Sequence, residues 1–136
     1  MNILLQAYVC APDKGGEFAM SWGWLSHLDN LLTDSDCVYV ASDSLTEEHI
    51  SKLNHVKLLK IEYPHNLYNF LKHTRIWYVL WQRYAYHVAI KSGISFDIVH
   101  VYSLSDYRRI GIWYKMRKAY TILGPVGGGR VVLKLC

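Results

Sequence analysis

The chain has 136 residues, of which 51% are hydrophobic and 19% charged, and its formal net charge at pH 7 is +4. A chain of this length and balance forms one globular domain with a substantial core, which excludes an intrinsically disordered protein. Its basic residues are spread over the second half, and no nucleic-acid motif accompanies them, so no nucleic-acid partner is expected.

The three cysteines, Cys10, Cys37 and Cys136, are far apart and form no CxxC pair. This usage favours a reduced intracellular compartment and gives no sign of a zinc site. The apolar first ten residues lack a basic leader and are typical of a strand, not of a signal peptide. We therefore expect a cytoplasmic protein without a bound metal.

Short apolar segments alternate along the chain with segments of helical spacing. The expected strands are residues 2–8, 37–42, 56–63, 96–103 and 119–124. The expected helices are residues 17–32, 44–54, about 67–91 and 106–118, the second opening with a capping-box pattern of Ser44 and Glu47. This alternation predicts an α/β protein, namely a Rossmann-like doubly wound parallel sheet with helices on both faces.

A glycine pair follows the first expected strand, at the sheet edge where open α/β folds bind ligands. Gly15 and Gly16 stand directly before Glu17 and a helix start. Free N–H groups at a helix N-terminus favour an anion, but a merely tight turn explains the glycines equally well. The GxGxxG spacing of a dinucleotide site is absent from this loop.

A second glycine-rich loop follows the last expected strand and contains Gly127, Gly128 and Gly129. Such a run leaves room for a ligand or for the backbone of another domain. A flexible connector would have the same composition.

The long helix expected at 67–91 is apolar around most of its circumference, with Arg83, His87 and Lys91 in one thin polar stripe. Its longest unbroken apolar run, residues 76–81, is too short to span a bilayer. A core helix packed against the sheet is the favoured interpretation. An acceptor-side or membrane-interface surface, with aromatic and basic side chains at headgroup level, stays open as the alternative.

His100 lies inside the fourth expected strand, two residues before its carboxyl end. A buried, hydrogen-bonded histidine is favoured over a catalytic one at this place. No Ser-His-Asp or Cys-His order stands out elsewhere, so the sequence gives little support to a hydrolase.

Taken together, four stretches resemble the N-terminal half of a GT-B glycosyltransferase of the retaining family 4 type. They are "GGEFAMSWGW" (15–24), "YVLWQRYAYHVA" (78–89), "FDIVHVYS" (96–103) and "ILGPVGGG" (122–129). The resemblance implies an acceptor-side domain over residues 1–129 and an atypical tail over 130–136. It also implies a nucleotide sugar as co-substrate, without another cofactor, and a glycan or lipid-linked acceptor.

The same resemblance assigns roles to the loops. Gly15 and Gly16 would let backbone amides approach the donor diphosphate, with Glu17 beside them. The loop at 127–129 would flank the acceptor and the interdomain cleft. The protein would act in the cytoplasm, and a lipid-linked acceptor leaves peripheral contact at the inner membrane face open.

Three departures from the family pattern limit these roles. Val101 and Tyr102 occupy the positions where relatives often carry a second histidine, so Tyr102 and His100 are only weak catalytic candidates. Arg130 stands where relatives tend to have an acidic residue. The C-terminal donor-binding domain is not in this sequence, so we expect the chain to need that domain or a partner chain for turnover. A non-catalytic Rossmann-like binding or interaction module is the alternative function.

Overall fold

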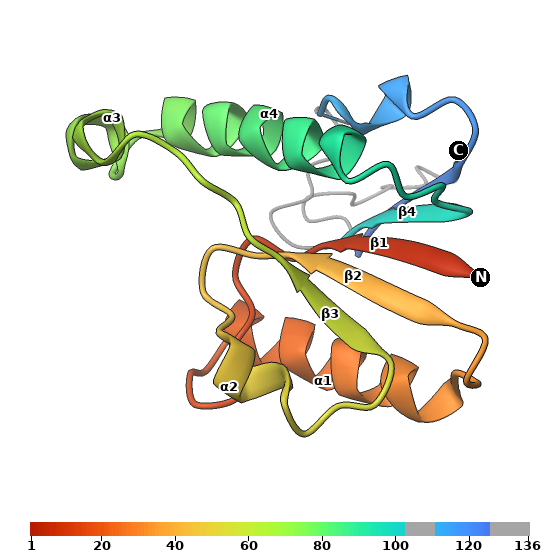
Figure 1. The fold of residues 1–136 in the computed structure, drawn as a ribbon. Coiled ribbons are helices and arrows are strands. Elements are labelled where there is room, and N and C mark those ends of the chain that lie inside the picture. The colour runs from red at the N-terminus through yellow and green to blue at the C-terminus, as the bar shows by residue number, and fades with distance from the viewer. Residues whose placement is uncertain (103–110, 126–136) are drawn as a thin grey trace, which may run out of the picture.

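The computed structural model describes residues 1–102 and 111–125. Strands and helices alternate over most of this length (Figure 1). The elements are β1 (Asn2–Gln6), α1 (Glu17–Leu31), β2 (Cys37–Ala41), α2 (Glu47–Ile50), β3 (Val56–Leu59), α3 (His65–Leu71), α4 (Arg75–Lys91), β4 (Ile98–Val101), the 3-10 helix η1 (Trp113–Lys115) and β5 (Tyr120–Leu123).

The five strands form one parallel sheet in the order β3-β2-β1-β4-β5. β1 is the central strand, and its Leu4 pairs with Tyr39 of β2 on one side and with Val99 of β4 on the other. Helices α1 and α2 cover one face of the sheet and α4 covers the opposite face (Figure 1). The architecture is therefore a Rossmann-like doubly wound α/β fold, as the alternation of elements predicts.

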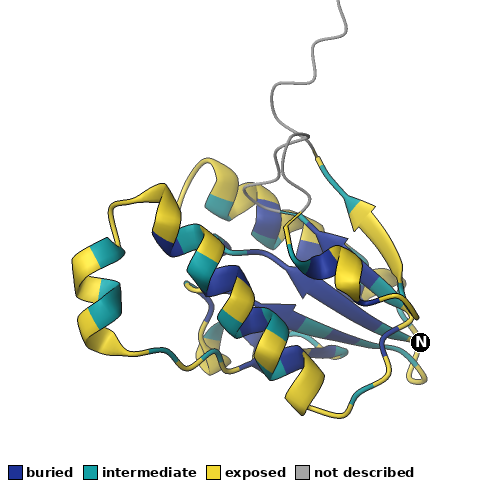
Figure 2. Ribbon diagram, turned by 90° about the horizontal axis from the view of Figure 1, so that it is seen from above, coloured by how far each residue is buried: buried dark blue, intermediate teal, exposed yellow. Residues whose placement is uncertain are grey.

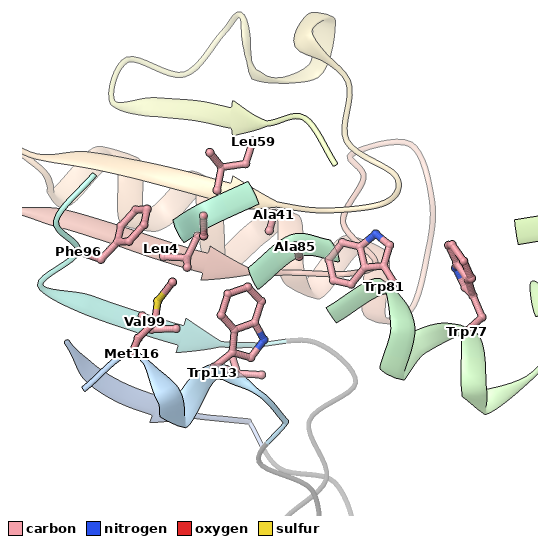
Figure 3. Packing of buried hydrophobic residues seen from close by; sticks show 12 residues of the cluster. Leu4, Ala41, Leu59, Trp77, Trp81, Ala85, Phe96, Val99, Trp113 and Met116 are labelled. Carbon is pink, nitrogen blue, oxygen red and sulfur yellow. The ribbon is translucent and has the colours of Figure 1, made fainter. Parts of the chain in front are cut away.

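Successive residues of each strand point to opposite faces of the sheet, so each face has its own hydrophobic cluster. The cluster under α1 is built of aliphatic side chains and contains Ile3, Leu5, Leu25, Val38 and Val40. The cluster under α4 is rich in large aromatic side chains. Its buried members include Trp77, Trp81, Phe96 and Trp113, and Figure 3 shows Trp77 as the one of these that lies farthest from Leu4 and Val99.

The long helix expected at 67–91 is in fact two helices, α3 and α4, separated by residues 72–74. Thr74 lies between them in an extended conformation, and its hydroxyl accepts a hydrogen bond from the backbone N–H of Trp77 at 3.4 Å. A threonine in this role caps a new helix and ends the preceding one. Seen from above, α4 turns buried residues toward the sheet, whereas α3 has none (Figure 2).

The helix expected at 44–54 is shorter and starts later. Thr46, not Ser44, caps α2: its hydroxyl accepts from the His49 N–H at 3.3 Å, while His49 Nδ1 accepts from the Thr46 N–H at 3.3 Å. Ser44 instead donates its hydroxyl proton to the Cys10 carbonyl at 2.9 Å and accepts from the Cys10 N–H at 2.8 Å. The capping pattern at Ser44 and Glu47 was therefore placed two residues too early.

The helix expected at 106–118 is the third expected helix that differs from the structure. Residues 103–110 lie outside the described part of the chain, and the described remainder contains only the short helix η1. The third and fourth strands end at Leu59 and Val101, sooner than expected. At Gly111 the backbone has φ +74°, a conformation that residues with a side chain rarely adopt, so this position favours glycine.

Candidate functional site

The start of α1 is an open stretch of backbone at the carboxyl end of β1. Gly16 occupies the N-cap position with φ +62°, and no side chain caps this helix end. A Cβ on either Gly15 or Gly16 would have no heavy atom within 4 Å apart from its own chain neighbours. Glu17 is exposed in the first helical turn. Gly16 is thus needed for its backbone conformation, and the space around both glycines is free for an approaching group.

His100 is a buried residue of β4, 9% exposed. Its Nε2 lies 2.8 Å from the Gly124 carbonyl oxygen, so the hydrogen bond requires the tautomer that carries the proton on Nε2. Burial lowers the pKa of His100, and the Gly124 bond opposes that change only in part. The side chain is therefore a neutral, hydrogen-bonded histidine that ties β4 to the end of β5.

Tyr102, directly after β4, belongs to an aromatic cluster with Trp24 of α1. The Trp24 ring stacks on Tyr102 with centroids 5.7 Å apart and meets the His100 ring edge-on at 5.5 Å. Trp24 is 41% exposed, so one side of this cluster faces solvent. An exposed indole of this kind can receive an apolar face of a ligand, such as that of a sugar ring.

A chain of hydrogen bonds links this cluster to the glycine pair. The Tyr102 hydroxyl donates to the Met20 carbonyl at 3.4 Å, and the Met20 N–H donates to the Gly16 carbonyl at 3.1 Å. Burial raises the pKa of Tyr102, so its phenol stays protonated at neutral pH. The structure therefore brings Tyr102 to within one helical turn of the glycine pair.

The second glycine-rich loop, Gly127, Gly128 and Gly129, lies outside the described residues, and its role stays a prediction. The described chain reaches Pro125, and the N–H of the preceding Gly124 donates to the Val101 carbonyl at 3.0 Å. Parallel β5 thus carries the chain to the same sheet edge at which α1 begins.

On the opposite face of the sheet, a cavity of about 960 Å³ opens between α4 and residues 111–115. We call it the cationic groove, after four basic side chains that line it. These are Lys72, Arg75, Arg83 and Lys115. All four are exposed, and none forms an ion pair with a described residue. Among the described residues that line the groove, none is acidic.

Neutral polar groups lie beneath these cations. Tyr8, Tyr78 and Gln82 line the groove, and Gln82 is only 8% exposed. The fully buried Gln6 donates from Nε2 to the Tyr78 hydroxyl at 3.4 Å. Burial raises the pKa of both Tyr8 and Tyr78 to about 12, so both phenols keep their protons at neutral pH.

The groove and the α1 start lie at the same edge of the sheet. Tyr8 follows the carboxyl end of β1, and Thr74 at the groove is the N-cap of α4. The Glu17 carboxylate is near enough to contribute to the raised pKa of Tyr78, after burial as the main cause. The cationic groove and the start of α1 therefore lie close together at the carboxyl edge, on opposite faces of the sheet.

Sequence reasoning did not identify the cationic groove. The basic residues were visible between aromatic ones, but the periodicity of the long helix indicated only its thin polar stripe. The groove needs Tyr8, Gly111 and Lys115 from other elements beside α4. Only the tertiary fold brings these together.

Within residues 1–102 and 111–125, no group of three or more His, Cys, Asp or Glu side chains could hold a metal ion. In that same part of the chain, no helix is both long and apolar enough to cross a bilayer.

The structure defines a Rossmann-like α/β domain, and the glycine pair, the Tyr102 cluster and the cationic groove lie at the carboxyl edge of its sheet. Comparison with known proteins found no matching family model, no similar curated protein and no similar solved structure. The chain is therefore assigned to a fold class and not to a protein family.

Proposed function

We propose that the chain is the acceptor-side domain of a retaining glycosyltransferase that takes its sugar from a nucleotide sugar. The acceptor is a glycan or a lipid-linked sugar. The observation that carries the proposal is the open space around the backbone of Gly15 and Gly16. Hydrogen bonds through Met20 link this backbone to Tyr102, whose ring stacks on Trp24. Such a place offers N–H groups to a diphosphate and an aromatic surface to a sugar.

In this proposal, the second half of the site comes from another domain or another chain. Lys14 is the basic residue within residues 10–24, and its Nζ lies over the Phe18 ring at 4.8 Å, so a single positive charge is available at the start of α1. A departing nucleoside diphosphate needs compensating positive charge, and closure of a second domain supplies it together with the exclusion of water. We therefore expect the 136-residue chain alone to transfer no sugar.

Binding to the glycine pair tests the proposal directly. Isotope-labelled protein would be titrated with a panel of nucleotide sugars while the amide signals of residues 15–18 are followed by NMR. We expect one nucleotide class to shift these signals at up to millimolar concentration. Gly15→Val should weaken that binding by about tenfold or more, because the new side chain occupies the approach to the backbone.

Gly23→Val is the matched control. Gly23 is exposed within α1, and a Cβ there also has no heavy atom within 4 Å. Its replacement should leave the affinity unchanged. If no nucleotide sugar shifts the signals of residues 15–18, or if both variants lose the same affinity, the glycosyltransferase proposal is wrong.

A further inference from the structure

We propose that the cationic groove binds a phosphate-bearing ligand, with a diphosphate group or a phosphomonoester between α4 and residues 111–115. This site uses none of the residues at the α1 start. It therefore stands or falls independently of the glycosyltransferase proposal.

The charge of the groove is the first argument. Lys72, Arg75, Arg83 and Lys115 come from three segments of the chain and line one cavity, with no acidic residue among its described lining. Like charges around one cavity repel each other, and without a described counter-ion this repulsion is balanced only by solvent. An anion with more than one negative charge that enters the groove lowers this repulsion.

The chemistry of the donors is the second argument. Arg75 and Arg83 carry guanidinium groups, which form paired hydrogen bonds with phosphate oxygens, and the two lysines act as point charges. The phenols of Tyr8 and Tyr78 stay protonated and therefore add no negative charge to the lining. This set has hydrogen-bond donors in excess, as a multiply charged oxyanion requires.

The construction of the walls is the third argument. The side-chain amide of Gln82 lies against Gly111, and this contact joins the 111–115 segment to α4. Trp81 of α4 and Trp113 of η1 are fully buried in the same hydrophobic cluster (Figure 3). The two walls that carry the cations are therefore held at a fixed spacing, so the groove is a preformed site.

The phosphate could belong to a free metabolite or to a lipid headgroup. Phe70, Ile76 and Val79 are exposed apolar residues of α3 and α4, and Val79 also lines the groove. Apolar side chains beside cations are typical of a surface that meets an anionic bilayer. Both sources present the same phosphate chemistry to the groove, so the experiment has one arm for each.

The first arm titrates the whole chain with inorganic pyrophosphate and follows the binding by calorimetry and by the amide signals of Tyr78, Arg83 and Lys115. The second arm measures sedimentation with vesicles that contain phosphatidic acid, against vesicles of phosphatidylcholine alone. The test variant is Arg75→Gln with Arg83→Gln. The control variant, Arg117→Gln with Lys118→Gln, removes the same charge from exposed residues that do not line the groove. Circular dichroism of both variants verifies their folding.

We expect the test variant to lose affinity by about tenfold or more and the control by less than about twofold. That loss in the pyrophosphate arm supports a free ligand, and the same loss confined to the phosphatidic acid vesicles supports a lipid headgroup. If neither probe binds, or if the two variants lose affinity equally, the proposal is overturned.

Discussion

The two faces of the sheet are packed in different ways. On the α1 face, aliphatic side chains such as Leu5, Leu25 and Val40 are almost completely buried and form a closed layer. On the α4 face, three buried tryptophans dominate, and the cationic groove opens beside them. Aliphatic side chains interdigitate under α1 and α2, whereas the bulky indoles of α4 and η1 act as spacers between these two elements.

Trp81 gives the strongest test of this difference. Its side chain is fully buried and meets the Tyr8 ring edge-on at 4.8 Å. We expect Trp81→Ala to lower the free energy of unfolding by about 3–5 kcal/mol, because it leaves a large cavity under α4. Urea unfolding followed by circular dichroism measures the effect.

The milder variant Trp81→Phe is the control for volume. The indole N–H of Trp81 has no hydrogen-bond partner within the described structure, so its removal breaks no bond there. A loss as large as that of Trp81→Ala would contradict the assignment of Trp81 as a space-filling residue.

Leu25 gives the matching test on the α1 face. It is fully buried in the aliphatic cluster. We expect Leu25→Ala to cost about 2–4 kcal/mol, at or below the cost at Trp81, because less volume is removed. The affinity of the cationic groove for pyrophosphate should not change in this variant, whereas Trp81→Ala should weaken it. Equal losses of affinity in the two variants would mean that the faces are not independent.

His100 gives the smallest effect, and it depends on pH. Burial lowers the pKa of the folded-state imidazole below its ordinary value of 6.5, so the unfolded chain binds the proton more readily. The neutral side chain then stabilises the folded state fully above a pH of about 6.5. This stabilisation is lost as the pH falls through the lower pKa of the folded state. His100→Gln keeps a donor for the Gly124 carbonyl and does not titrate.

The measurement is the urea midpoint of both proteins between pH 5 and pH 8. We expect the wild-type midpoint to fall more steeply toward acid pH than that of His100→Gln. Other histidines titrate in both proteins, so the difference between the two profiles is the quantity to compare. Parallel profiles would show that burial does not hold His100 neutral.

The fold could be predicted from the sequence because its signals are local. Strands such as residues 37–42 are short, apolar and bounded by turn residues, and their alternation with helices implies a parallel sheet. The break between α3 and α4 was missed because both sides of it share the same aromatic and basic composition. Thr74 was the one local signal, since its hydroxyl caps a helix.

The candidate site could be predicted only where it lies within one loop. Gly16 was identified as a glycine that a turn or a ligand requires, and its φ of +62° accounts for it. The role of Trp24 beside Tyr102 was not foreseen, because the residues are distant in sequence and meet only across the sheet edge. The groove depends in the same way on residues of several elements.

The position of β1 in the middle of the sheet has a consequence for synthesis. One neighbour, β2, follows it closely in the chain, but the other, β4, lies far downstream: the Asn2 N–H donates to the Asp97 carboxylate, 95 residues away, at 2.7 Å. On the ribosome, β1 therefore emerges with one edge that has no native partner until β4 has been translated and released from the exit tunnel. Throughout that interval the nascent chain presents an apolar strand whose backbone N–H and C=O groups are unpaired along one edge, as in the segments that chaperones shield.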